Sequence, residues 1–125
     1  MLRVFIADDS IGFGTLAAAW LEGFEDIEVV GAVRSAPEAL EQVVGAQPDV
    51  VILDRLLPQP EQSGRVLEHV RQELPTVAVV LVSGMPDDDL ASEARVAGAD
   101  GYVSKAANAD ALAAAVRRAA ATRRA

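Results

Sequence analysis

The chain has 125 residues, a length typical of one domain, and its 51% hydrophobic but only 4% aromatic residues predict a core of Val, Leu, Ile and Ala. The absence of cysteine excludes disulfides and thiolate chemistry, and the single histidine argues against a zinc site or a catalytic triad. The formal net charge of −8 argues against direct binding of nucleic acid, which needs clustered Lys and Arg.

Short apolar segments alternate with amphipathic segments along the chain, which is the pattern of a parallel α/β sheet. We predict a helix after each of five strands, at residues 2–7, 27–33, 49–54, 77–83 and 100–105. The third and fourth strands are almost continuously Val, Ile and Leu, so we expect them at the centre of the sheet. The predicted fold class is α/β, a doubly wound three-layer (flavodoxin-like) fold with a five-stranded parallel sheet in the order 2-1-3-4-5 and five helices.

We expect one domain over residues 1–121 and a short basic tail over residues 122–125. The charged residues after Asp110 are all arginines, which suits the negative end of a last helix or a junction to a downstream domain. No apolar run approaches the roughly 20 residues of a membrane span, and no leader-like segment opens the sequence. We therefore expect a cytoplasmic protein without a membrane partner.

The segment FIADDSIGFGTLA, residues 5–17, fits two incompatible kinds of site. Its glycines follow the G-x-G-x-x-A pattern of dinucleotide-binding loops, whereas Asp8 and Asp9 at the end of the first strand suggest a cation site. Two carboxylates directly before the helix would repel a pyrophosphate, and the second strand ends near Val33 and Arg34 without the acid that binds a ribose. The cation site is therefore the favoured interpretation.

Polar side chains are predicted at the carboxyl ends of four strands. Asp8 and Asp9 end the first strand, Asp54 ends the third, Ser83 the fourth and Lys105 the fifth. Neighbouring strands lie about 4.8 Å apart, so the carboxylates would meet at the switch point of the sheet. Because like charges at about 4 Å repel by roughly 4 kcal/mol at an effective dielectric near 20, the acids must share protons or hold a cation. Hard oxygen ligands around a small ion predict Mg²⁺.

Lys105 is the only lysine among the eleven basic residues. Its flexible stem can bridge the roughly 10 Å of two strand spacings to Asp54 when one anion lies between them. Ser83 ends the intervening strand and can donate a hydrogen bond to the same anion. These positions predict that a phosphoryl group on Asp54 would contact both Lys105 and Ser83.

With these residues in place, the sequence resembles bacterial response-regulator receiver domains, which have the CheY-like superfamily fold, from Leu2 to about Ala120. The matching motifs are ADDS (7–10), DRLLP (54–58), LVSG (81–84) and GADGYVSK (98–105). The segments IEVVGAV and AGADGYVSK look most like the receivers of regulators that carry a helix-turn-helix output domain.

The resemblance implies a phosphoacceptor and a metal site. Asp54 would accept a phosphoryl group from the phosphohistidine of a sensor histidine kinase or a phosphotransfer protein. Asp8, Asp9 and Asp54 would hold Mg²⁺ together with the backbone carbonyl of Leu56. Metal and ammonium charges would then neutralise the charge that develops on the transferring group.

The resemblance also implies a switch and its partners. Ser83 and Lys105 would bind the phosphoryl oxygens, and Tyr102 would be the aromatic side chain that turns inward when Ser83 moves. The face formed by the fourth helix, fifth strand and fifth helix would signal, and a homodimer could form through it. We expect no direct nucleic-acid binding by this domain, while a DNA-binding output domain could lie outside the sequence given.

One departure from the family pattern and two further positions carry predictions. Ala106 stands where the family usually has proline after the lysine, so the peptide bond before Ala106 can be trans. Leu56 and Met85 lie two residues after the acceptor and after the serine, where side chains in this family flank the path of a hydrolytic water. Both are apolar, so we predict slow hydrolysis of the phosphorylated state.

Our main interpretation is a Mg²⁺-dependent phosphoacceptor switch in a two-component pathway. It is not an enzyme, since it would catalyse only its own phosphorylation and dephosphorylation. One alternative is a pseudo-receiver that docks partners without phosphorylation, which the missing proline leaves open. The other is an aspartyl-nucleophile phosphatase or hydrolase, for which the sequence shows neither a second acid/base partner beside Asp54 nor a cap domain.

Overall fold

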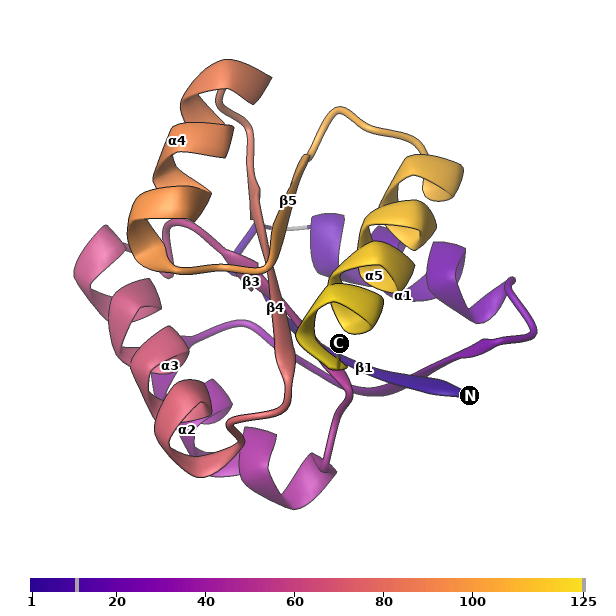
Figure 1. Ribbon diagram of the computed structural model, residues 1–125, viewed down its shortest axis with the longest axis horizontal. Helices are drawn as coiled ribbons and strands as arrows, with labels where there is room; N and C mark the ends of the chain where they lie inside the picture. The colour runs from indigo at the N-terminus through magenta and orange to yellow at the C-terminus, as the bar shows by residue number, and fades with distance from the viewer. Residues whose placement is uncertain (11, 125) are drawn as a thin grey trace.

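A parallel sheet runs through the middle of the molecule with helices on both of its sides (Figure 1). The computed structural model describes residues 1–10 and 12–124, apart from the side chains of Asp87 and Arg124. The strands are β1 (Leu2–Ala7), β2 (Ile27–Val33), β3 (Val50–Asp54), β4 (Ala78–Ser83) and β5 (Gly101–Ser104). The helices are α1 (Phe13–Glu22), α2 (Ala36–Ala46), α3 (Pro60–Glu73), α4 (Asp87–Ala97) and α5 (Ala109–Arg124).

The strands pair in parallel in the order β2-β1-β3-β4-β5. This order confirms the predicted fold class, and each predicted strand begins and ends within one residue of the observed one. The difference that affects the site is at β5, which ends at Ser104, so Lys105 is the first residue of the following loop. The carboxyl ends of all five strands lie at one edge of the sheet, where ligands of this fold bind.

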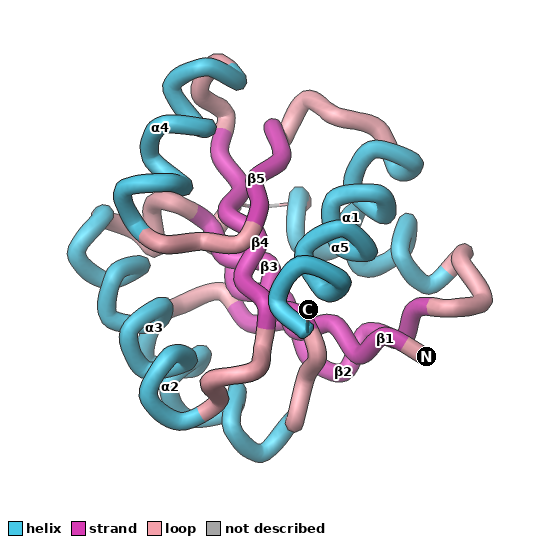
Figure 2. The backbone as a smooth tube through the Cα atoms, viewed as in Figure 1, coloured by secondary structure: helices cyan, strands magenta, loops and turns pink. Residues whose placement is uncertain are grey.

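Two hydrophobic layers hold the sheet between the helices. Every residue of β3 and β4 is buried, as expected for central strands that are covered on both faces. Helices α2, α3 and α4 cover one face, and α1 and α5 cover the other (Figure 2). Side chains alternate between the layers along β3, where Val51 and Leu53 face the first group of helices and Val50 and Ile52 face the second.

Local sequence signals set the helix ends. Ser35 caps the start of α2, where its Oγ accepts a hydrogen bond from the Glu38 backbone N–H at 3.3 Å and donates one to Glu38 Oε1 at 2.9 Å. Gly98 ends α4 in the left-handed conformation with φ 79°, and Gly12 has φ 99° directly before α1. The turn at Gly12 therefore lets the chain leave β1 and enter α1 within a few residues of the paired aspartates.

Two arginines form hydrogen bonds and ion pairs at the edge of the sheet where the strands begin, opposite the carboxyl ends. Arg71 of α3 donates to the carbonyl oxygens of Val77 and Gly98, both at 2.9 Å, and to Asp100 Oδ2 at 2.8 Å. Arg123 of α5 lies 3.6 Å from Asp100 Oδ1. These contacts join α3 and α5 to the starts of β4 and β5, on the edge that faces away from the acidic strand ends.

Helix α5 continues through Arg124, so residues 122–124 of the expected basic tail form the last turn of this helix. Ala125 lies outside the described residues. None of the described helices is both long and apolar enough to cross a membrane.

Candidate functional site

Three aspartates meet at the carboxyl edge of the sheet. Asp8 follows β1 and Asp54 ends β3, and only 1% and 4% of their surfaces are exposed. Asp9 lies beside them and is half-buried. One carboxylate oxygen from each of the three residues lies within 4.8 Å of the others. The first and third strands thus bring together the acids that the sequence assigns to one site.

Lys105, the only lysine, pairs with two of the three aspartates of this acidic cluster. Lys105 Nζ lies 2.9 Å from Asp8 Oδ2 and 3.0 Å from Asp54 Oδ2, and it donates a hydrogen bond to Ser10 Oγ. We expected an anion between Lys105 and Asp54, whereas the structure joins them directly because the lysine stem spans the strand spacing. The ammonium thus offsets part of the carboxylate charge.

Burial and charge act in opposite directions on Asp54. Removal from water raises the pKa of Asp54 from 3.8 to about 6, the negative charge of Asp8 adds to this rise, and hydrogen bonds from the Leu56 N–H and Lys105 oppose it. Burial also disfavours the charged ammonium, but the contacts with Asp8 and Asp54 outweigh burial and raise the pKa of Lys105. Asp54 is therefore mostly ionised at neutral pH, at a cost that a bound cation would relieve.

Backbone and hydroxyl groups orient the two buried aspartates. The Leu56 N–H donates to Asp54 Oδ1 at 3.2 Å, and the Ser63 hydroxyl donates to the Asp54 carbonyl oxygen at 2.6 Å. The Ser10 N–H donates to Asp8 Oδ1 at 2.7 Å. Neither serine was predicted as a site residue from the sequence. The place of Ser10 directly after the aspartate pair could have identified it, whereas Ser63 lies in α3 without such a signal.

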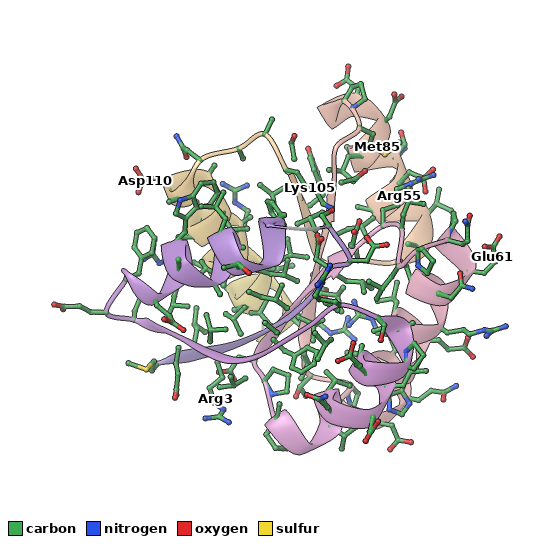
Figure 3. The ribbon with its side chains drawn as sticks, turned by 180° about the vertical axis from the view of Figure 1, so that it is seen from behind. Arg3, Arg55, Glu61, Met85, Lys105 and Asp110 are labelled. Atoms are coloured by element: carbon green, nitrogen blue, oxygen red, sulfur yellow. The ribbon has the colours of Figure 1, made fainter. Side chains whose placement is uncertain are left out.

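Ser83 and Tyr102 lie on the neighbouring strands β4 and β5. Ser83 ends β4 and is buried, and its Oγ accepts a hydrogen bond from the Met85 N–H at 3.2 Å. Figure 3 shows Met85 at the same end of the molecule as Lys105. Tyr102 of β5 is 42% exposed, so its ring lies at the surface in this structure. The inward turn of Tyr102 remains a prediction.

The loop after β5 is held without the proline that the family usually has. Leu57–Pro58 is the only cis peptide bond within the described residues, so Lys105–Ala106 is trans. The Lys105 N–H donates to the Ser83 carbonyl at 2.9 Å, and the Ala106 N–H donates to Ser104 Oγ at 3.1 Å. A proline has no N–H for the second contact, so alanine supplies a different anchor for the loop.

The donor set of the acidic cluster fits a divalent cation. Asp8 Oδ2 is buried and accepts no hydrogen bond from any described residue, although the charge of Lys105 lies close to it. Buried carboxylate oxygens without enough hydrogen-bond donors are stabilised when they coordinate a hard cation. Asp8, Asp9 and Asp54 could each supply one oxygen. The backbone carbonyl of Leu56, assigned to the same ion from the sequence, stays a prediction.

Two adjoining hollows of about 440 Å³ each lie over α4, β5 and α5. Both are lined by Tyr102, Ala115 and Arg118, and most of their other lining side chains are alanines. Small side chains allow the backbone of another helix to approach closely. This hollowed face is the one formed by the fourth helix, fifth strand and fifth helix, where the resemblance to receiver domains implies signalling.

Comparison with known proteins agrees with this geometry. The family model for the response regulator receiver domain matches residues 4–117. The transcriptional regulatory protein LnrK of Bacillus subtilis is 31% identical over 117 residues, which cover 93% of this chain and 52% of LnrK. The response regulator protein VraR of Staphylococcus saprophyticus is 27% identical over 94% of this chain and 56% of VraR. This chain therefore spans about half the length of these relatives.

A solved structure shows the same architecture. The signal receiver domain of the putative response regulator NarL from Mycobacterium tuberculosis superposes with a TM-score of 0.82 and 28% identity, over 96% of each chain. The likeness thus covers the sheet, both helical layers and the strand ends that carry the acidic cluster.

Proposed function

The chain belongs to the response regulator receiver domain family, and from this premise we propose that Asp54 accepts a phosphoryl group from the phosphohistidine of a sensor histidine kinase or phosphotransfer protein. The observation that carries the proposal is the meeting of a buried carboxylate, two further acids and the only lysine at one edge of the sheet. This arrangement combines a nucleophile with the positive charge that phosphoryl transfer requires.

In the proposed reaction, a carboxylate oxygen of Asp54 attacks phosphorus, so that one O–P bond forms while the P–N bond to histidine breaks and the imidazole retains the electron pair. With a pKa of about 6, Asp54 supplies the ionised nucleophile at neutral pH. Lys105 Nζ, 3.0 Å from Asp54 Oδ2, lies where it can neutralise charge on the transferred oxygens.

The proposal includes Mg²⁺ as the ion held by Asp8, Asp9 and Asp54 with the Leu56 carbonyl. When bound, Mg²⁺ supplies positive charge against the phosphoryl oxygens. The acids of this chain hold and orient the ion. Lys105 contacts the carboxylates of Asp8 and Asp54, so the ammonium and the ion would share two of the three acids.

We propose that the signal reaches the surface through Ser83 and Tyr102. Movement of the Ser83 hydroxyl toward the phosphoryl group would break its contact with the Met85 N–H and let Tyr102 turn inward. A second link is Arg55, the residue after the acceptor, which pairs with Glu93 of α4 at 3.2 Å. A shift of the acceptor loop would therefore also move α4.

The hollowed face over α4, β5 and α5 is the proposed surface for a homodimer or an output partner. Its alanine lining suits close helix packing, and Tyr102 lies within it, so movement of that ring would change the surface. The names of the relatives suggest transcriptional regulation as the output of a longer protein. We propose no direct contact between this domain and DNA, in keeping with its net charge of −8.

The test is incubation with acetyl phosphate, with and without Mg²⁺, followed by intact mass measurement. We expect one phosphoryl group per chain, only with Mg²⁺, and none in Asp54→Asn. Asp110→Asn removes an exposed carboxylate on α5, away from the cluster, and should behave as wild type (Figure 3). Repeated turnover of acetyl phosphate without a stable adduct would indicate a hydrolase, and no adduct in folded wild-type protein would indicate a pseudo-receiver.

A further inference from the structure

Ser10 makes a contact with Lys105 that the proposed chemistry does not yet use. Lys105 Nζ donates hydrogen bonds to Asp54 Oδ2 and to Ser10 Oγ, and it lies 2.9 Å from Asp8 Oδ2. The ammonium is thus held by two hydrogen bonds and one ion pair, to oxygens of three different residues. Phe13 adds an aromatic ring whose centroid lies 5.3 Å from the same nitrogen.

Ser10 is itself fixed to the acidic cluster. Its backbone N–H donates to Asp8 Oδ1 at 2.7 Å, which holds the start of the loop after β1 against the aspartate. The Ser10 hydroxyl therefore faces Lys105 from a backbone position that does not depend on the lysine. One residue thereby connects the metal-site acid to the ammonium.

The three residues that contact the Lys105 ammonium differ in what happens to them during the proposed reaction. Asp8 would bind the cation, and Asp54 would lose its free carboxylate when it is phosphorylated. Only the Ser10 hydroxyl is neutral and stays chemically unchanged. It is therefore the acceptor that can keep hold of the ammonium while the other two contacts change.

We propose that Ser10 is a positioning residue that holds the Lys105 ammonium toward Asp54 during phosphoryl transfer. This inference rests on the proposed function of Asp54. It also supplies a restraint for a lysine that is followed by a trans bond to alanine. Ser10 acts through Lys105, so removing its hydroxyl should slow transfer without changing how the donor or the metal binds.

The kinetic test compares Ser10→Ala with Ser10→Thr, which keeps a hydroxyl group. At saturating Mg²⁺ we expect Ser10→Ala to lower the maximal rate of phosphorylation by acetyl phosphate about tenfold, the effect of losing one hydrogen bond to a charged group. The donor concentration for half-maximal rate should stay within about twofold, and Ser10→Thr should recover most of the rate. Thr15→Ala removes an exposed hydroxyl from α1 and is the matched control.

A double-mutant cycle separates this role from a general effect on the loop. In a Lys105→Ala background, Ser10→Ala should cause no further loss of rate, because the contact is already absent. An equal loss in both backgrounds, or a wild-type rate in Ser10→Ala, would overturn the proposal. Failure of wild-type protein to form the Asp54 adduct would instead refute the proposed function.

A second measurement does not depend on activity. Lys105 is the only lysine, so ¹⁵N-lysine labelling gives one side-chain signal without assignment. We expect a slowly exchanging ammonium signal in wild-type protein and Ser10→Thr, and faster proton exchange in Ser10→Ala. Unchanged exchange in folded Ser10→Ala would overturn the proposal, and if that variant does not fold, the same comparison is made with Ser10→Cys, whose thiol is a weak acceptor.

Discussion

Replacing Asp54, the proposed phosphoacceptor, should make the metal-free protein more stable. Folding raises the pKa of Asp54 from 3.8 to about 6, so the folded state binds a proton more tightly than the unfolded state does. Such a group destabilises the fold as pH rises through this range. At roughly 1.4 kcal/mol for each unit of pKa, the raised pKa of Asp54 corresponds to a loss of about 3 kcal/mol of folding stability above pH 7. Asp54→Asn removes the buried charge, while Asp8 keeps an ion pair with Lys105.

The assay is urea unfolding of wild type and Asp54→Asn between pH 4 and 8 in buffer with a chelator. We expect the two proteins to be equally stable near pH 4, where Asp54 is largely protonated. The variant should become more stable by about 3 kcal/mol above pH 7, because the raised pKa of Asp54 already includes the opposing contact with Lys105. Glu41→Gln, which removes an exposed carboxylate on α2, should show no such pH-dependent difference.

Magnesium provides the converse test. Mg²⁺ should stabilise wild type more than Asp54→Asn, because the ion relieves the repulsion among the aspartates. The difference in free energy of unfolding that favours Asp54→Asn without metal should therefore shrink or change sign when Mg²⁺ is added. If Asp54→Asn is less stable than wild type at pH 7.5 in the chelator, then the Asp54–Lys105 pair outweighs the cost of burial and the reasoning is refuted.

Three further predictions concern lifetime and stability. The double change Leu56→Asn with Met85→Glu should shorten the lifetime of the phosphorylated state several-fold, because it places polar groups near the hydrolytic water. The lifetime is measured from the decay of the phosphorylated mass over time, and a decay rate equal to that of wild type would contradict the prediction. Arg71→Met should destabilise the fold by about 2 kcal/mol, because it removes three hydrogen bonds at the edge of the sheet opposite the aspartates. Urea unfolding tests this, with Gln72→Ala, a change of an exposed side chain, as the control. Equal stabilities of wild type and Arg71→Met would contradict the prediction. Gly98→Ala should cost about 1 kcal/mol, since φ is 79° there, and an unchanged midpoint would count against strain at that position.

The order of the strands and the meeting of the acids could be predicted from sequence because both follow from simple rules. Near-continuous apolar runs identify the central strands, and parallel strands end at one edge of the sheet. Asp8 and Asp54 are 46 positions apart in sequence but end adjacent strands, so no loop conformation had to be known to bring them together.

The contacts of the surrounding loops could not be predicted in the same way. The approach of Ser10 to Lys105 depends on the backbone between β1 and α1, including the positive φ of Gly12. The bond from Ser63 to the Asp54 carbonyl depends on how α3 packs, nine residues after the acceptor. The direct pairing of Lys105 with Asp54 depends on a side-chain rotamer that no periodicity specifies.

Two connections lead from the acidic edge to the hollowed face, along which we propose that the signal travels. Arg55, directly after Asp54, pairs with Glu93 of α4, and Lys105 begins the loop that leads from β5 into α5. Helix α4 is therefore paired with the residue after Asp54, and α5 follows the loop that begins at Lys105. Both helices form part of the hollowed face. Under the proposed function, a change in charge at Asp54 would act on two of the three elements that form this face.

The most direct test of the central claim is to locate the phosphoryl group chemically. Wild-type protein is treated with acetyl phosphate and Mg²⁺, reduced with borohydride, which converts an aspartyl phosphate to homoserine, and digested for peptide mass mapping. We predict homoserine at position 54 alone, in Mg²⁺ but not in a chelator. Homoserine at another aspartate, or none in folded protein with Mg²⁺ present, would contradict the assignment of Asp54 as the phosphoacceptor.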